Sequence, residues 1–245
     1  MRRLNIGQIS LPYEIRWSPD RKSIGLSLSN SSELTVNAPS SAALDEIEAT
    51  LERKKPWLLR KLRAVDSQEE APGPKEYLSG EKLLYNGRQH RIEALEKPGL
   101  DEPEVEFADG RFRIEAPSYE RDADRVEAVR GALKEWYWCV AEENLPERAC
   151  KYARKLGLGS VEVLIYDSDT KWGESKGDSI RLNWRLMLAP TRIQDYIIVH
   201  ELSHLKHPET PTHHSKPFWH TVGSLLPDYE ERKEWLRLEG SILSL

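Results

Sequence analysis

Hydrophobic and polar residues alternate in the first third of the chain and again between residues 83 and 117. In the first region the alternating apolar residues are Tyr13, Ile15 and Trp17, then Ile24, Leu26 and Leu28, then Leu34 and Val36. A period of two predicts strands that bury one face. In the second region, Asn86-Gly87 and Asp109-Gly110 separate alternating runs and predict two tight β-hairpins.

Apolar residues at helical spacing predict the helices. They recur between residues 44 and 62, where Pro56 predicts a break or kink near Lys55 because proline has no N–H to donate. A second helical pattern begins after Tyr119, and a further run over 146–156 ends at Gly157, a residue suited to the end of a helix. The remaining elements are strands at 161–165 and 180–184 around a turn-rich stretch at 167–178, and helices at 191–206, 217–226 and 229–237. Asp228 and Glu231 match a capping box at the start of the last helix.

The clearest linker is the segment 66–75 (DSQEEAPGPK), which has charge, proline and glycine but no periodicity. The β pattern resumes after it and gives way to helices near residue 119. We therefore expect a β-rich N-terminal region with one helix over residues 1–118, and a second half over 119–245 with a small sheet and several helices. The fold class that these patterns predict is α+β.

The composition is that of a soluble globular protein. The chain has 245 residues, of which 38% are hydrophobic and 31% charged, and no stretch approaches the roughly 18 apolar residues of a spanning helix. The formal charge of −5 argues against a nucleic-acid partner, because proteins that bind nucleic acids usually have more basic than acidic residues. The first residues lack the apolar core of a signal peptide, and Cys139 and Cys150 lack the CxxC spacing of a redox or metal site. These features predict a cytoplasmic protein without a membrane partner, and they leave its oligomeric state open.

Five consecutive residues, His200-Glu201-Leu202-Ser203-His204, form an HExxH motif inside the helix expected at 191–206. Two histidines four residues apart lie on one face of a helix, so both imidazoles can bind one metal ion. Glu201 is rotated by about 100° from His200, so it addresses water on the metal rather than the metal itself. The spacing is typical of zinc-dependent hydrolases in which the glutamate acts as general base.

A catalytic zinc site needs a third protein ligand and an open position. The segment after the motif offers five candidates, namely His207, Glu209, His213, His214 and His220. Pro208 and Pro211 end the helix, so the chain can turn back toward the metal. The spacing by itself leaves the choice among the five candidates open.

Several segments around the motif resemble the YgjP-like metallopeptidase family, a group of zincin-type hydrolases. They are Lys171-Trp172-Gly173-Glu174-Ser175, the run from Ile180 to Pro190, the run from Tyr196 to Leu205, and His214-Ser215-Lys216-Pro217-Phe218-Trp219. The resemblance implies a zincin-like C-terminal half with Zn²⁺ as cofactor, Glu201 as general base, and three metal ligands, His200, His204 and His214. Two features depart from the family. The loop between His204 and His214 is longer than usual, which leaves His207 and His213 as competing ligands. The family's Arg-Trp-Gly-Ser-Cys also reads Lys-Trp-Gly-Glu-Ser here, so no catalytic role is assigned to residues 171–175.

Three functions are consistent with these residues, and the first is the one that we expect. It is a zinc metallopeptidase acting on a peptide or protein, with the strand at 180–184 available for pairing with the substrate. Its oxyanion-stabilising candidates are Lys171, His213, His220 and Tyr229. The second function is a metal-dependent nucleoside triphosphate pyrophosphatase at the same site, which the resemblance also supports. The third is a non-catalytic zinc-binding module whose site is closed by a fourth protein ligand, such as His207 or His213.

Overall fold

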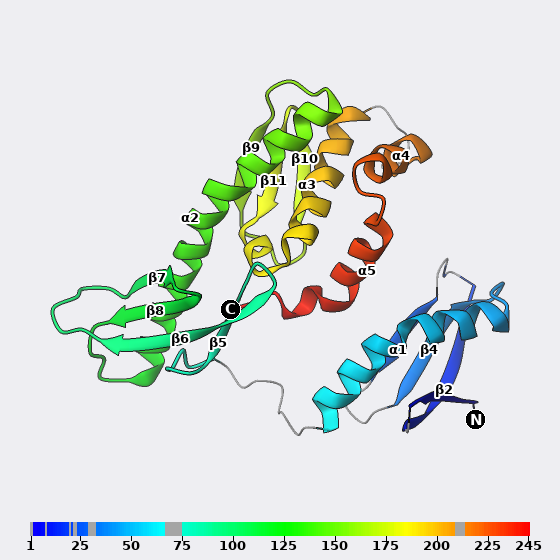
Figure 1. Cartoon of the computed structure of the whole chain (residues 1–245), viewed down its shortest axis with the longest axis horizontal. Helices are drawn as coiled ribbons and strands as arrows, with labels where there is room; N and C mark the ends of the chain where they lie inside the picture. Colours follow the sequence, from blue (N-terminus) through cyan, green and yellow to red (C-terminus); the bar gives the residue numbers. More distant parts are fainter. Residues whose placement is uncertain are drawn as a thin grey trace. The chain divides into compact units, whose positions relative to one another are not determined.

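The computed structural model of the chain describes residues 2–7, 9–19, 21, 24–28, 33–66, 75–208 and 214–245. These residues form five α-helices and three small mixed sheets, so the predicted α+β class is confirmed. The chain divides into two compact units, Met1–Pro74 and Lys75–Leu245 (Figure 1).

The first unit is a four-stranded sheet with one helix. Its strands are β1 (Arg2–Ile6), β2 (Ile9–Ser18), β3 (Gly25–Leu28) and β4 (Leu34–Pro39), in the order β1-β2-β4-β3, and its helix is α1 (Leu44–Asp66). β2 and β4 are parallel, and the two outer pairs are antiparallel. Alternate strand residues such as Leu4, Leu11 and Val36 are buried, and so are Ile47 and Leu51 of α1. The period of two in the sequence marks the buried face at positions such as Val36, but Trp17, which the pattern also included, is 46% exposed.

Of the break or kink predicted near Lys55, the break is wrong, because α1 runs through Pro56 without interruption. A proline inside a helix removes one backbone hydrogen bond and crowds the preceding turn, at a cost of about 3 kcal/mol. Apolar side chains on both sides of the proline are buried, namely Ile47, Leu51, Leu58 and Leu62. Burial of each contributes about 1.5–3 kcal/mol, so their packing outweighs the cost of the proline.

The second unit begins with a four-stranded sheet built from two hairpins. Its strands are β5 (Lys82–Tyr85), β6 (Arg88–Glu96), β7 (Glu104–Ala108) and β8 (Arg111–Ala116), in the order β5-β6-β8-β7. Both predicted hairpins are confirmed. The φ angles are 49° at Asn86 and 76° at Gly87, and 51° at Asp109 and 74° at Gly110. Positive φ at both central residues is what a type I′ turn requires.

A single long helix, α2 (Asp122–Leu156), follows this sheet. It includes Pro146, whereas the sequence pattern predicted two separate runs. Figure 1 shows α2 extending from the β5–β8 sheet to the second small sheet of the unit. Buried residues on both sides of the proline, such as Ala141 and Ala149, keep the helix continuous through packing. The helix ends as predicted at Gly157, which has a φ of 69° and whose N–H bonds back to the last turn.

A three-stranded sheet and a set of helices complete the second unit. The strands are β9 (Glu162–Tyr166), β10 (Gly173–Lys176) and β11 (Ser179–Asn183), in the order β10-β11-β9. The helical elements are η1 (Trp184–Leu188), α3 (Thr191–Lys206), α4 (Lys216–Leu225), α5 (Tyr229–Glu239) and η2 (Gly240–Ile242). Two expectations for this sheet are corrected. The strand β10 lies inside the stretch that was predicted to be turn-rich. The strand β11 is the central strand, so it offers no free edge for a substrate. In the described part of the chain, no helix combines the length and apolar character needed to cross a bilayer.

The boundary between the units lies at Pro74/Lys75, at the predicted linker, whereas the expected boundary was at 118/119. Residues 75–118 belong to the second unit because their sheet packs on α2. The rings of Phe112 and Tyr137 are fully buried, with centroids 5.8 Å apart. The Tyr137 hydroxyl donates a hydrogen bond of 2.6 Å to the Leu84 carbonyl oxygen. The β5–β6 turn also contacts the segment before α3, because the Gly87 N–H donates to the Leu188 carbonyl oxygen at 3.0 Å.

The capping box predicted at Asp228 does not form. Asp228 precedes α5, but its side chain makes no capping hydrogen bond. Its Oδ1 instead accepts a hydrogen bond of 2.9 Å from Nε of Arg232. This ion pair lowers the pKa of the Asp228 carboxyl group. A guanidinium is a stronger partner for a carboxylate than a backbone N–H, so the ion pair replaces the cap.

Candidate metal centre

The helix α3 carries the HExxH residues and begins and ends where the sequence predicted. Ile198, Val199 and Leu202 on this helix are fully buried, so packing fixes its position. Arg148 of α2 reinforces this, because its Nη2 atom lies 2.5 Å from Oδ1 of Asp195. Figure 1 shows α3 beside β10 and β11. The polar residues of the motif therefore project from a rigid element.

Three histidines converge at the end of α3. His200 and His204 belong to α3, and His214 directly precedes the N-cap residue of α4. Their ligand atoms all lie within 4.8 Å of one another. The Nε2 atoms of His200 and His214 are 3.1 Å apart. Among the candidates that the sequence left open, the structure thus brings His214 to the motif.

The cluster fits a divalent metal ion by its donor chemistry. Two nitrogen ligands on one tetrahedral zinc lie about 3.3 Å apart, close to the separation of the His200 and His214 nitrogens. Burial, followed by the nearby His204 and His214, lowers the pKa of His200 to about 3, so its imidazole is neutral, as a ligand must be. Nδ1 of His200 is buried and has no hydrogen-bond partner among the described residues. A cation would relieve part of the cost of burying this ring.

Aromatic rings of α4 hold the histidines in place. The ring centroids of His204 and Phe218 are 4.6 Å apart, and Trp219 stacks on His214 at 5.4 Å. Tyr229 stacks in turn on Trp219 at 5.1 Å. The Ser215 hydroxyl accepts a hydrogen bond of 3.4 Å from the Phe218 N–H and so caps the helix that positions these rings.

Glu201 lies beside the cluster, with 7% of its surface exposed, and its side chain packs against the backbone of β10 at Gly173. Burial and the nearby Glu174, opposed by Lys171, raise its pKa to about 7. A carboxyl group with this pKa can both accept and return a proton near neutral pH.

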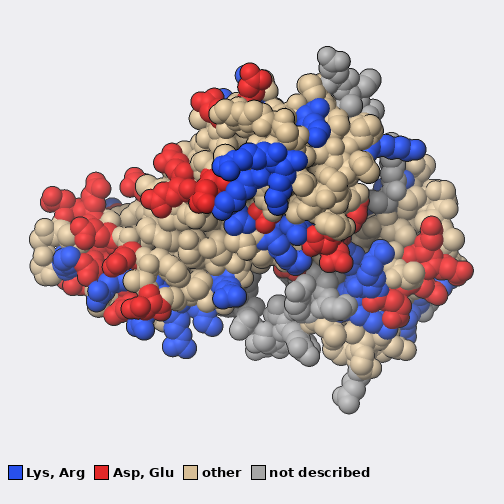
Figure 2. Space-filling model, turned by 45° about the horizontal axis from the view of Figure 1, so that its top comes forward, with Lys and Arg blue, Asp and Glu red and all other residues tan. Residues whose placement is uncertain are grey.

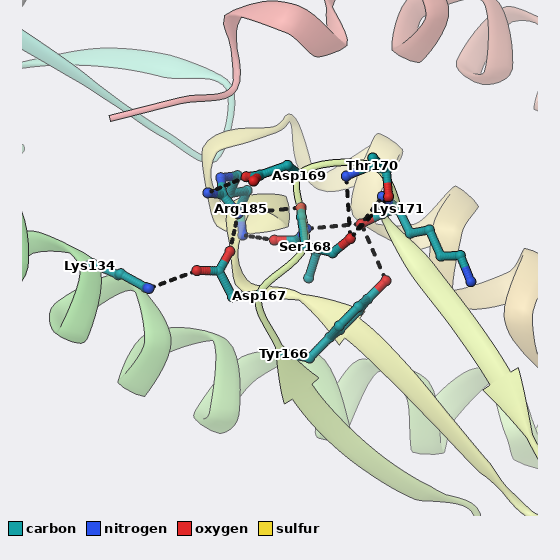
Figure 3. A network of polar contacts seen from close by, with 9 residues as sticks. Lys134, Tyr166, Asp167, Ser168, Asp169, Thr170, Lys171 and Arg185 are labelled. Carbon is teal, nitrogen blue, oxygen red and sulfur yellow. Dashed lines mark hydrogen bonds and ion pairs between the residues drawn. The ribbon is translucent and has the colours of Figure 1, made fainter.

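The loop before β10 is tied down by the polar network in Figure 3. Asp167 pairs with Arg185, and its Oδ2 lies 2.7 Å from Nζ of Lys134 on α2. Asn183 is 1% exposed, and its Nδ2 donates to the carbonyl oxygens of Ser168 at 2.6 Å and Lys171 at 2.9 Å. These bonds fix the path of the chain into β10 and hence the backbone on which Glu201 rests.

The other candidate residues lie elsewhere or outside the described residues. His207 is not part of the histidine cluster, and its Nε2 atom is 2.8 Å from Oγ1 of Thr221. His220 is exposed on α4 and is likewise outside the cluster. His213 and Glu209 lie outside the described residues. Of the oxyanion candidates, Lys171 lines the cavity beside Glu201, whereas Tyr229 stacks on Trp219.

Two features of the site were missed from the sequence. One is β10, and the other is the close contact of Gly173 with Glu201. The dipeptide Gly177-Asp178 was a usable signal, because such a pair often joins two antiparallel strands. It does so here between β10 and β11, with a φ of 60° at Gly177. No sequence signal pairs Gly173 with Glu201.

Two solved structures of metallopeptidase zymogens are similar to part of this chain. Abylysin of Pyrococcus abyssi is 27% identical, with coverage of 40% of this chain and 91% of that chain and a TM-score of 0.34. Jannalysin of Methanocaldococcus jannaschii is 18% identical, with coverage of 37% of this chain and 91% of that chain and a TM-score of 0.34. No curated protein matches the chain. The model of the YgjP-like metallopeptidase domain matches residues 22–239. The chain therefore belongs to the YgjP-like metallopeptidase family.

Proposed function

We propose that this chain is a zinc-dependent peptidase in which His200, His204 and His214 hold the metal and Glu201 is the general base. Membership of a metallopeptidase family supports a metal-dependent peptidase. The observation that carries the residue assignment is the convergence of three imidazoles within 4.8 Å, next to one buried carboxyl group. Three neutral nitrogen ligands leave a coordination position open, as catalytic zinc sites require.

Bound zinc would supply Lewis-acid chemistry, which polarises a carbonyl oxygen and acidifies water. The protein's own contribution centres on Glu201. Its carboxylate accepts a proton from water at Oε as the water oxygen adds to the scissile carbonyl carbon. When the C–N bond breaks, the same carboxyl group returns the proton to the leaving nitrogen.

The strand β10 is the element on which we expect a peptide substrate to lie. It is an edge strand that pairs with β11 on one side, and Glu201 packs against it at Gly173. An extended peptide can add to such an edge through backbone hydrogen bonds, with its scissile bond close to Glu201. This placement uses β10 where the sequence pattern had suggested residues 180–184.

The test is cleavage of a peptide library by the full chain, purified without a histidine tag and loaded with zinc. We expect one zinc per chain and cleaved peptides. Glu201→Gln should keep the zinc and lose at least about 100-fold in activity. Glu162→Gln is the matched control, because Glu162 is an exposed carboxylate on β9 and has no assigned role in the site. Full activity of Glu201→Gln would show that the general base has been misassigned.

The same preparation separates the two alternative functions. Turnover of nucleoside triphosphates without any peptide cleavage would favour the pyrophosphatase. The non-catalytic zinc module is tested by replacing zinc with cobalt. The absorption spectrum of the cobalt-substituted protein distinguishes three protein ligands plus water from four protein ligands. A four-ligand spectrum would contradict a catalytic site.

A further inference from the structure

A cavity of about 360 Å³ lies beside the candidate metal centre, and the proposed reaction uses the part of it at His200, Glu201 and Gly173. Its lining includes His200 and Glu201 of α3, Lys171 and Trp172 before β10, Gly173 of β10, and Lys233, Leu236 and Arg237 of α5. The cavity therefore extends from the reacting position toward the surface of α5.

The lining of this cavity is positively charged. Glu201 is the one acidic residue among the described residues that line it, against three cationic side chains. Lys171 pairs with Glu174 at 3.0 Å and Arg237 with Glu234 at 2.8 Å, but neither carboxylate lines the cavity. Figure 2 shows that Lys and Arg side chains gather into patches on one face of the molecule, separate from patches of Asp and Glu.

Lys233 is the cation held most directly at the metal centre. Its Nζ atom lies over the ring of Trp219, 4.5 Å from the ring centroid. Trp219 stacks in turn on His214, so Lys233 lies one ring away from a proposed metal ligand. An ammonium group over an aromatic face keeps its charge and can still pair with an anion.

The wall between these cations is apolar. Trp172, Ile197 and Leu236 line the cavity together with the three cations. A side chain with a short apolar stem and an anionic end matches this combination, because the stem covers apolar surface and the end reaches an ammonium or guanidinium group.

The position of Glu201 identifies which side of the substrate enters the cavity. In the proposed reaction Glu201 returns its proton to the leaving nitrogen, so that nitrogen lies next to the carboxyl group. Because Glu201 also lines the cavity, the residue that begins with the leaving nitrogen is the one adjacent to it.

We propose that the cavity selects substrates with a carboxylate on the residue after the scissile bond, held by Lys171, Lys233 and Arg237. This inference rests on the proposed peptidase function and adds its substrate class. The carboxylate belongs either to an Asp or Glu side chain or to the free C-terminus of the peptide, and the same cations would recognise both.

The test compares peptides that differ only in the residue after the scissile bond. The zinc-loaded full chain is given a first set of peptides with Glu, Gln or Leu at this position, each followed by further residues and an amidated C-terminus. Peptides of a second set end at this position, with either a free or an amidated C-terminus. We expect kcat/KM to be about tenfold higher with the carboxylate than with the matched amide in at least one set. A preference in the first set identifies the side chain as the source, and one in the second set identifies the C-terminus.

Two variants test the cations themselves. Lys233→Glu should abolish or reverse the preference for the carboxylate, and Arg237→Gln should weaken it. The matched control is Lys151→Glu, an exposed lysine of α2 outside the cavity lining, which should keep the wild-type preference. Cleavage with equal kcat/KM for carboxylate and amide, or a preference that survives Lys233→Glu, would overturn the inference and leave the peptidase function standing. If the wild type cleaves no peptide, the peptidase function itself is wrong and the inference falls with it.

Discussion

Glu201 occupies the space that a side chain on Gly173 would fill. A Cβ atom built on Gly173 would lie 2.7 Å from Cγ of Glu201 and 2.8 Å from its Oε1 atom. Heavy atoms at such distances clash, so the two residues can share this position only because one of them is glycine. The backbone of β10 thus forms the surface against which the proposed general base rests.

Substitution of Gly173 by alanine should therefore displace the Glu201 carboxyl group. We expect Gly173→Ala to lower kcat/KM by about 10- to 100-fold, because small misplacements of a catalytic group are costly. Zinc content should be unchanged, since the three atoms nearest to the added methyl group all belong to Glu201 and none to a histidine. Gly131→Ala is the control, because a Cβ atom at this position of α2 meets no atom within 4 Å. Unimpaired activity of Gly173→Ala would contradict the positional role of this glycine.

In the metal-free chain, the Glu201 carboxyl group should become destabilising as the pH rises toward neutrality. The pKa of Glu201 is raised from 4.5 to about 7, so ionisation of this group is less favourable in the folded chain than in the unfolded chain. Its destabilising effect is absent below about pH 4.5 and reaches its full size above pH 7, on the order of 3 kcal/mol.

Urea unfolding in a chelating buffer at pH 5 and pH 8 measures this effect. The difference in unfolding free energy between Glu201→Gln and the wild type should grow as the pH rises, because glutamine cannot ionise. A pH-independent difference would mean that the Glu201 carboxyl group has an ordinary pKa.

Asn183 should matter for stability more than any exposed asparagine. Its side chain donates to two loop carbonyl oxygens and accepts from the Arg185 N–H at 3.0 Å. Asn183→Ala leaves these groups without their partner and should lower the unfolding free energy by about 2–3 kcal/mol. Asn144→Ala is a suitable comparison, because Asn144 is exposed on α2 and its effect should stay within about 0.5 kcal/mol. Equal effects of the two substitutions would exclude a special role for Asn183.

Substitution of His214 and substitution of His207 should have opposite effects on zinc binding. His214→Ala removes a member of the cluster, so stoichiometric zinc binding and activity should both be lost. His207→Ala should keep zinc, because His207 contacts Thr221 instead, and should only reduce stability. Equilibrium dialysis with metal analysis gives the zinc content of each variant. Retention of zinc by His214→Ala together with loss by His207→Ala would reverse the proposed ligand assignment.

Local patterns were sufficient for much of the fold. The α+β class, the bounds of α3, the turns at Asn86-Gly87 and Asp109-Gly110, and the helix end at Gly157 all followed from short-range signals. Such signals work because φ preferences and the periods of helices and strands act within a few residues. The local rules failed where packing opposed them, as at Pro56 and Pro146, which remain inside helices flanked by buried residues.

The sequence alone determined the chemistry of the candidate site, because the four-residue spacing of His200 and His204 places both on one helix face and the next residue, Glu201, beside them. Only the tertiary structure decided which residues lie next to that helix. They are His214 from the segment before α4, Gly173 from a strand that the pattern did not predict, and the cationic residues of α5. These partners lie far apart along the chain, and contacts of this kind depend on how whole elements pack rather than on any local preference.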